Sequence, residues 1–164
     1  MGLSHAHAVL GHQQEAEGYL AMANQISLPL DDDSFIPILN YDLSFKILLE
    51  GKVCIKLGRL AEKKGSPDNA QAWYEKAATI LAQPLPESAD FPEYIRVGII
   101  NRQASVAIKL GNMKDFIFFF KEGAKKSKAL GSKKKIKEAM RNLRLARNQW
   151  QYEYQLMKLD EVLL

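Results

Sequence analysis

Three histidines near the N-terminus are the first residues of this sequence that could bind a metal or transfer a proton. On a helix, His5 and His12 would share a face because they lie seven residues apart, whereas His7 would lie off that face. No cysteine accompanies them, and Glu15 is the nearest acidic residue. This spacing is poor for zinc, so we predict histidines that face solvent, and no metal site.

The single cysteine, Cys54, lies between Val53 and Ile55 in an apolar helical stretch. A reactive thiol needs a cationic or helix-N-terminal setting, and the neighbouring Lys52 and Lys56 would point to other faces of the helix. We therefore predict a buried cysteine that serves packing. One cysteine cannot form an internal disulfide, which indicates a reducing compartment and a cytoplasmic location.

Acidic residues supply no recognisable catalytic pattern. The run 31–33 is Asp-Asp-Asp, but a calcium loop needs alternating oxygen ligands, a glycine and a closing glutamate. The pairs Glu15/Glu17 and Glu87/Asp90 belong to no recognisable cleft. Glycine-rich phosphate loops and serine-nucleophile motifs are also missing. We predict that the protein is not an enzyme and uses no cofactor.

Composition describes the scaffold that must position any site. The chain has 164 residues, of which 47% are hydrophobic and 26% charged, and this suits one globular domain spanning 1–164. No apolar run approaches 18 residues, which predicts no membrane span. The first ten residues hold no lysine or arginine, so we expect neither a signal peptide nor a transit peptide.

Apolar residues recur at three- and four-residue steps along most of the chain, with very little strand alternation, which predicts an all-α fold. Glycine and proline breaks divide it into antiparallel helix hairpins at about 1–28, 40–82, 91–129 and 132–164. A short pattern repeats after three of the glycines, with residues at positions +5, +9 and +12 in the order small, large, small. These residues are Ala16, Leu20 and Ala23 after Gly11; Ala70, Tyr74 and Ala77 after Gly65; and Phe116, Phe120 and Gly123 after Gly111. The third copy departs at Phe116, where a large ring replaces the small residue.

The second copy resembles a tetratricopeptide repeat, because seven of its residues fall at that motif's spacing: Leu57, Gly58, Ala61, Gly65, Ala70, Tyr74 and Ala77. A competing register, which puts Gly51 and Gly58 in the places of Gly58 and Gly65, stays open. The resemblance implies a right-handed α-solenoid, ended by a C-terminal capping helix, that binds a protein or peptide. The segment 131–164 resembles the end of bacterial helix-turn-helix regulators, in which such an array follows a DNA-binding domain. It implies the regulatory or oligomerisation part of a bacterial transcriptional regulator.

In tetratricopeptide proteins, polar residues on the first helix of each hairpin line the inner groove and hold an extended peptide. The resemblance carries this role to Lys52, Lys56 and Arg59 in the second hairpin, and to Asn101, Arg102 and Ser105 in the third. Asparagine can hold a peptide backbone through its donor and its acceptor, whereas lysine and arginine hold carboxylates.

Charge is divided unevenly along the chain. Residues 1–100 hold 8 Lys and Arg against 13 Asp and Glu (net −5), and residues 101–164 hold 15 against 6 (net +9). In 132–150 an apolar stripe is formed by Ile136, Ala139, Met140, Leu143, Ala146 and Trp150. The opposite face is formed by Lys133, Lys137, Arg141, Arg144 and Asn148, and we place Lys134, Lys135 and Arg147 on its flanks. A solvated face is the preferred interpretation. The alternatives are a nucleic-acid-binding surface over 121–147 and a surface that meets an acidic partner.

The run 116–120, Phe-Ile-Phe-Phe-Phe, is apolar all round a helix. Such a helix is either buried on every side or presents a patch for association. We therefore expect Phe118 or Phe119 to be exposed, and a homodimer formed through this helix is a further hypothesis.

Overall fold

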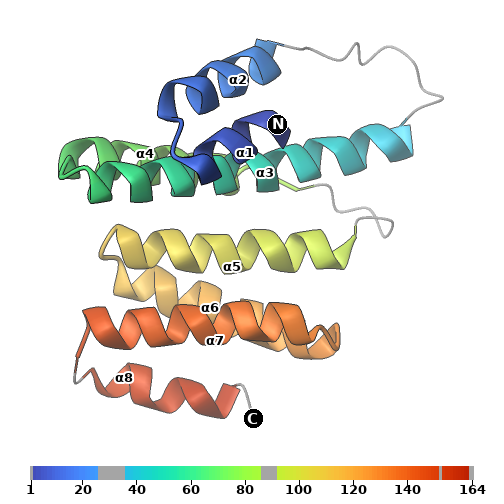
Figure 1. Ribbon diagram of the computed structural model, residues 1–164. Helices are drawn as coiled ribbons and strands as arrows, with labels where there is room; N and C mark the ends of the chain where they lie inside the picture. The colour runs from blue at the N-terminus through green and yellow to red at the C-terminus, as the bar shows by residue number, and fades with distance from the viewer. Residues whose placement is uncertain (1, 26–35, 86–91, 152, 163–164) are drawn as a thin grey trace. The chain divides into compact units, whose positions relative to one another are not determined.

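A computed structural model describes residues 2–25, 36–85, 92–151 and 153–162, without the side chains of 24 and 36–44. The regular elements in these ranges are all helical, which confirms the all-α prediction (Figure 1). They are α1 Gly2–Leu10, α2 Gln13–Gln25, α3 Ile36–Lys63, α4 Pro67–Leu81, α5 Glu93–Lys109, α6 Met113–Ala129, α7 Lys133–Gln149, α8 Tyr154–Met157 and the 3₁₀ helix η2 Lys158–Val162. The acidic run at 31–33 and the pair Glu87/Asp90 lie outside the described residues.

The helices form two compact units, Met1–Pro92 and Glu93–Leu164. In the first unit α1 pairs with α2 and also packs on α3, and α3 pairs with α4. In the second unit α5 pairs with α6, α7 contacts both of them, and the C-terminal α8 and η2 lie against α7 and α6. Each unit therefore contains helix hairpins stacked on a neighbouring helix, the arrangement expected of tetratricopeptide-like repeats (Figure 1).

The turns between paired helices depend on glycine. Gly65 has a φ of 71°, a left-handed conformation that other residues adopt only with strain. It allows the N–H of Ser66 to donate to the carbonyl of Ala61 at 3.0 Å, and its own N–H to donate to the carbonyl of Glu62 at 3.0 Å. These two bonds end α3 and turn the chain directly into α4. Three further glycines have positive φ and end a helix in the same way: Gly11, Gly111 and Gly131.

The register of the repeat follows from the pairing of α3 with α4. Gly58 lies inside α3 against the buried ring of Tyr74, and a Cβ at this glycine would fall 2.6 Å from the ring. Ala61 and Ala77 are buried, one on each helix of this hairpin. Gly65 forms the turn, so the competing register is wrong because it would put Gly58 there.

The core of the second unit is built around aromatic rings. Phe116 and Phe120 are fully buried, and the Phe116 ring centroid lies 5.6 Å from that of Phe120 and 5.7 Å from that of Trp150. Alanines from neighbouring helices make room for these rings, among them Ala104 on α5 and Ala139 on α7. The large residue at 116 is accommodated because the small residues lie on the helices opposite.

Candidate interaction surfaces

One narrow strip of α3 stays accessible between its packed sides. The α4-facing side includes Gly51 and Gly58, whose positions leave no room for a Cβ beside Leu81 and Tyr74. The pairing of α1 with α3 covers another side, where Gly11 lies near the Leu60 side chain. The partly accessible residues between residue 49 and residue 59 recur at steps of three and four: Leu49, Lys52, Lys56 and Arg59.

This strip carries all three residues predicted for a groove on the second hairpin. Lys52, Lys56 and Arg59 are each half-buried, while Val53, between them in sequence, is fully buried. Their alkyl stems are therefore sheltered and their charged ends share one side of the helix. Such a row of cations can hold carboxylates, and arginine can do so with two parallel hydrogen bonds.

The corresponding region of α5 has a different environment. Asn101 is 2% exposed and Ser105 is 4% exposed, whereas Arg102 is half-buried. The Asn101 side-chain amide donates to the Lys135 carbonyl at 3.3 Å, and the Asn142 amide of α7 donates to the Asn101 carbonyl at 2.8 Å. Helix α7 therefore covers the face of α5 that carries Asn101.

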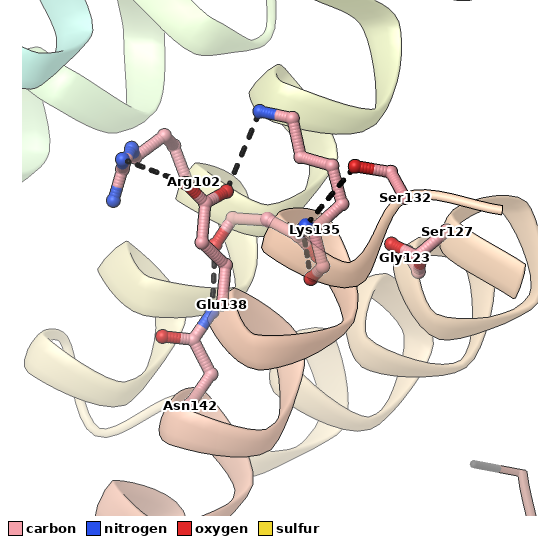
Figure 2. A network of polar contacts seen from close by, with 8 residues as sticks. Arg102, Gly123, Ser127, Ser132, Lys135, Glu138 and Asn142 are labelled. Carbon is pink, nitrogen blue, oxygen red and sulfur yellow. Dashed lines mark hydrogen bonds and ion pairs between the residues drawn. The ribbon is translucent and has the colours of Figure 1, made fainter. Parts of the chain in front are cut away.

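A charged cluster strengthens this contact between α5 and α7. The Lys135 ammonium lies 3.4 Å from a Glu138 carboxylate oxygen and 4.2 Å from the centre of the Tyr94 ring. Arg102 lies 3.7 Å from the other oxygen of Glu138 (Figure 2). Lys135 is only 4% exposed, so these partners replace the water that its charge gives up.

Residues 51–80, which run from the middle of α3 to the penultimate residue of α4, match the model of the tetratricopeptide repeat. The chain therefore carries this repeat. No curated protein and no solved structure matches the chain. The repeat is typically an interaction module rather than a catalyst, so the match supports a role in protein–protein interaction. The cationic strip of α3 lies on the first helix of this repeat.

Outside the repeat, the outer side of α7 is the most strongly charged helix face of the second unit. Ala139, Leu143 and Ala146 are buried, as the predicted apolar stripe requires, but Met140 is exposed and Ile136 only half-buried. The exposed cations, which we call the basic face of α7, are Lys133, Lys134, Lys137, Arg141 and Arg144. Placing Lys135 on its flank was wrong, because this residue turns inward. The sequence signal for this inward orientation was Glu138, an acidic residue three positions after Lys135 and therefore one helical turn away.

Phe118 is the large aromatic residue that α6 exposes. It is 61% exposed, whereas Phe119 is half-buried against the core of the second unit. The two rings meet edge to face, with centroids 5.3 Å apart. The expectation that one of these two residues is exposed is met by Phe118.

The histidines and the cysteine form no reactive centre among the described positions. His12 is exposed, but His5 and His7 are half-buried, and the His7 ring lies 5.6 Å from that of His12. Cys54 is fully buried as predicted, and burial raises the pKa of its thiol to about 12. In the described ranges no three His, Cys, Asp or Glu side chains gather as metal ligands. No described helix is long and apolar enough to cross a membrane.

Proposed function

We propose that this protein is a peptide- or protein-binding module whose ligand presents acidic groups to the cationic strip of α3. The observation that carries the proposal is the position of Lys52, Lys56 and Arg59 on one accessible side of the first helix of the tetratricopeptide repeat. In such repeats this helix lines the ligand groove.

The physical environment of the strip favours carboxylates. Half-buried cations interact more strongly with an anion than fully solvated ones, because the surrounding protein lowers the effective dielectric constant. Leu49 lies one turn before Lys52 and supplies an apolar contact beside the charges. A ligand with acidic side chains and one apolar residue would match this pattern.

The test is selection of peptides from a phage-displayed library on the full chain, followed by fluorescence anisotropy with a selected peptide. We expect Lys56→Glu to weaken binding by about 10-fold or more, because an attraction becomes a repulsion. The matched control is Lys76→Glu, which makes the same charge change at an exposed position of α4. This control should change the Kd by less than about 2-fold. Equal Kd values for the wild type and Lys56→Glu, or a library that yields no binder, would overturn the proposal.

We further propose that the module acts in the cytoplasm as the regulatory or oligomerisation part of a bacterial transcriptional regulator, and that it forms a homodimer. The exposed Phe118 supports self-association, because a large aromatic side chain in solvent favours contact with another surface. The lone cysteine supports a reducing compartment.

Measurement of the particle mass by light scattering tests the proposed homodimer and the proposed role in a regulator. A regulator of this kind should have a dimer mass that Phe118→Asp reduces to that of a monomer and that the selected peptide shifts. The control is Phe45→Asp, which alters an exposed phenylalanine of the first unit. A monomer mass for the wild type would argue against the homodimer, and a dimer mass that neither Phe118→Asp nor the peptide alters would argue against the regulator and against a dimer formed through Phe118. Either result would leave peptide binding by the strip standing.

A further inference from the structure

The basic face of α7 collects five cations and no acid on one side of a 17-residue helix. Four of them follow one another at steps of four, four and three residues: Lys133, Lys137, Arg141 and Arg144. At 1.5 Å per residue this row is about 16 Å long. Lys134 lies beside the row on the same exposed side.

The described residues of the second unit form no ion pair with these charges. The one acidic residue of α7, Glu138, contacts Arg102 and Lys135. No member of the basic face forms an ion pair with a described residue. Like charges four residues apart destabilise a helix by a few tenths of a kcal/mol per pair. The buried Lys135 shows the contrast, because the fold gives that cation both a carboxylate and an aromatic ring.

The composition of the face distinguishes between possible anionic partners. Three of the five cations are lysines, and lysine is depleted in protein–protein interfaces, whereas it is a common point-charge ligand of phosphate. A membrane surface would require an apolar side to insert, and the apolar side of α7 is occupied by the core of the second unit. These features favour a nucleic acid.

The face also indicates which nucleic acid. Single-stranded binding depends on aromatic platforms for the bases, and the basic face contains no aromatic residue. RNA duplexes are recognised partly through 2′-hydroxyls, and the exposed uncharged polar side chains of α7, Asn148 and Gln149, lie at its C-terminal end beyond the row of cations. A DNA duplex presents one negative charge per about 1.7 Å of its axis, so a row of about 16 Å can meet several phosphates.

We infer that the basic face of α7 binds the phosphate backbone of duplex DNA without reading its sequence. This activity lies in the second unit and is separate from the peptide-binding strip on α3. The basic face can therefore bind DNA even if the strip binds no peptide, and the strip can bind a peptide even if the basic face binds no DNA.

The experiment is fluorescence anisotropy of the full chain with a labelled 20-base-pair duplex of mixed sequence, titrated between 50 and 300 mM salt. Engagement of the four-residue row predicts that log K falls with log salt with a slope of about −4. A second duplex of unrelated sequence should bind within about 3-fold of the first, because phosphate contacts carry no sequence information.

A charge-neutralising variant localises the contact. Lys133→Gln/Lys137→Gln should weaken binding at 50 mM salt by about 10-fold or more and reduce the slope by about 2. The matched control, Lys63→Gln/Lys64→Gln, removes two exposed lysines at the end of α3 and alters the net charge equally. It should leave the slope unchanged. The melting temperature of the α7 variant should not fall, because two repelling charges have been removed.

Several outcomes would overturn the inference. They are absence of binding at 50 mM salt, an equal loss of affinity in both double variants, and tighter binding of single-stranded DNA, an RNA duplex, an acidic peptide or anionic vesicles than of duplex DNA. Equal losses in the two variants would mean that net charge alone attracts the DNA. A peptide-binding defect in Lys56→Glu would have no bearing on any of these results.

Discussion

The helices α3 and α5 begin equivalent hairpins, yet one of two corresponding pairs of residues differs in accessibility. Lys56 and Arg102 each lie nine residues before the turn glycine, and Arg59 and Ser105 each lie six before it. Lys56, Arg59 and Arg102 are half-buried, but Ser105 is buried. The position of a residue relative to the turn glycine therefore sets the direction of its side chain. Whether a ligand can reach that side chain depends on the neighbouring helices.

Helix α7 packs directly on α5. It bonds to both the side chain and the carbonyl of Asn101. Glu138 holds Arg102, which is the residue equivalent to Lys56. Asn101 and Ser105 are buried on α5, whereas the three residues predicted on α3 are half-buried, which is why we propose the peptide-binding role for the strip of α3.

The largest effect should come from Phe116→Ala, which converts the third copy of the pattern to the small residue found in the second. Because this ring is fully buried between Phe120 and Trp150, we expect a loss of about 3–5 kcal/mol in the free energy of unfolding. Urea unfolding followed by circular dichroism measures it. Phe118→Ala on the same helix is the control and should cost less than about 1 kcal/mol, because its ring is exposed. A loss below 1 kcal/mol for Phe116→Ala would mean that this core is not closely packed.

A second prediction concerns the closer approach of the helices in the hairpin of α3 and α4. Gly58 corresponds to Ala104, so the hairpin of α5 and α6 already accommodates a Cβ at this position. Gly58→Ala should destabilise by about 1–3 kcal/mol, because the new methyl group would meet the buried Tyr74 ring. Gly18→Ala is the control, since nothing lies within 4 Å of a Cβ there, and it should stabilise α2 by up to about 1 kcal/mol. Thermal melts of both variants compare them, and a stabilised Gly58→Ala would contradict the register.

The contact between α5 and α7 is tested by Asn101→Ala. It removes the amide that bonds to the Lys135 carbonyl, and we expect a loss of about 1–2 kcal/mol. Asn148→Ala alters an exposed asparagine of α7 and should stay within about 0.5 kcal/mol of the wild type. If both variants unfold at the same urea concentration, the buried amide contributes no net stability.

The turns and the hairpin register could be predicted from the sequence, because glycine at a helix end and small residues at fixed steps are local signals. Gly65, Ala70 and Tyr74 fall where the pattern placed them. The burial of Asn101 and Lys135 could not be predicted in the same way. Their contact joins residues 34 apart in sequence, so it depends on how α7 packs on α5. That packing is set by the whole core of the second unit rather than by a local pattern.

The charged residues of α7 also divide into those whose exposure a local pattern predicts and those whose orientation depends on packing. Helical periodicity predicts which cations lie opposite the apolar stripe, and Lys133, Lys137, Arg141 and Arg144 are indeed exposed. It cannot decide the orientation of a residue at the edge of the stripe, such as Lys135. Tyr94 and Glu138 determine that orientation, and Tyr94 belongs to another helix.

The smallest effect should be a difference in alkaline stability between the two units. Burial raises the pKa of Cys54 from 9.0 to about 12 and also raises the pKa of Tyr74, and both lie in the hairpin of α3 and α4. A raised pKa adds stability that is complete below the ordinary value and is lost as the pH rises toward the folded value. The loss should therefore begin near pH 9 and reach roughly 1 kcal/mol by pH 10. Cys54 and Tyr74 both belong to the first unit, so we expect this loss there.

The two tryptophans make this difference measurable, because Trp73 lies on α4 and Trp150 follows α7. In urea titrations at pH 8 and pH 10, the transition reported by Trp73 in a Trp150→Phe chain should move further than that reported by Trp150 in a Trp73→Phe chain. Cys54→Ala should remove part of the pH dependence reported by Trp73, because it removes the titrating thiol. A thiol reagent at pH 8 gives an independent check, since a pKa three units higher lowers the thiolate fraction roughly 1000-fold. Rapid labelling of the folded chain would show that Cys54 is accessible and would invalidate the predicted difference.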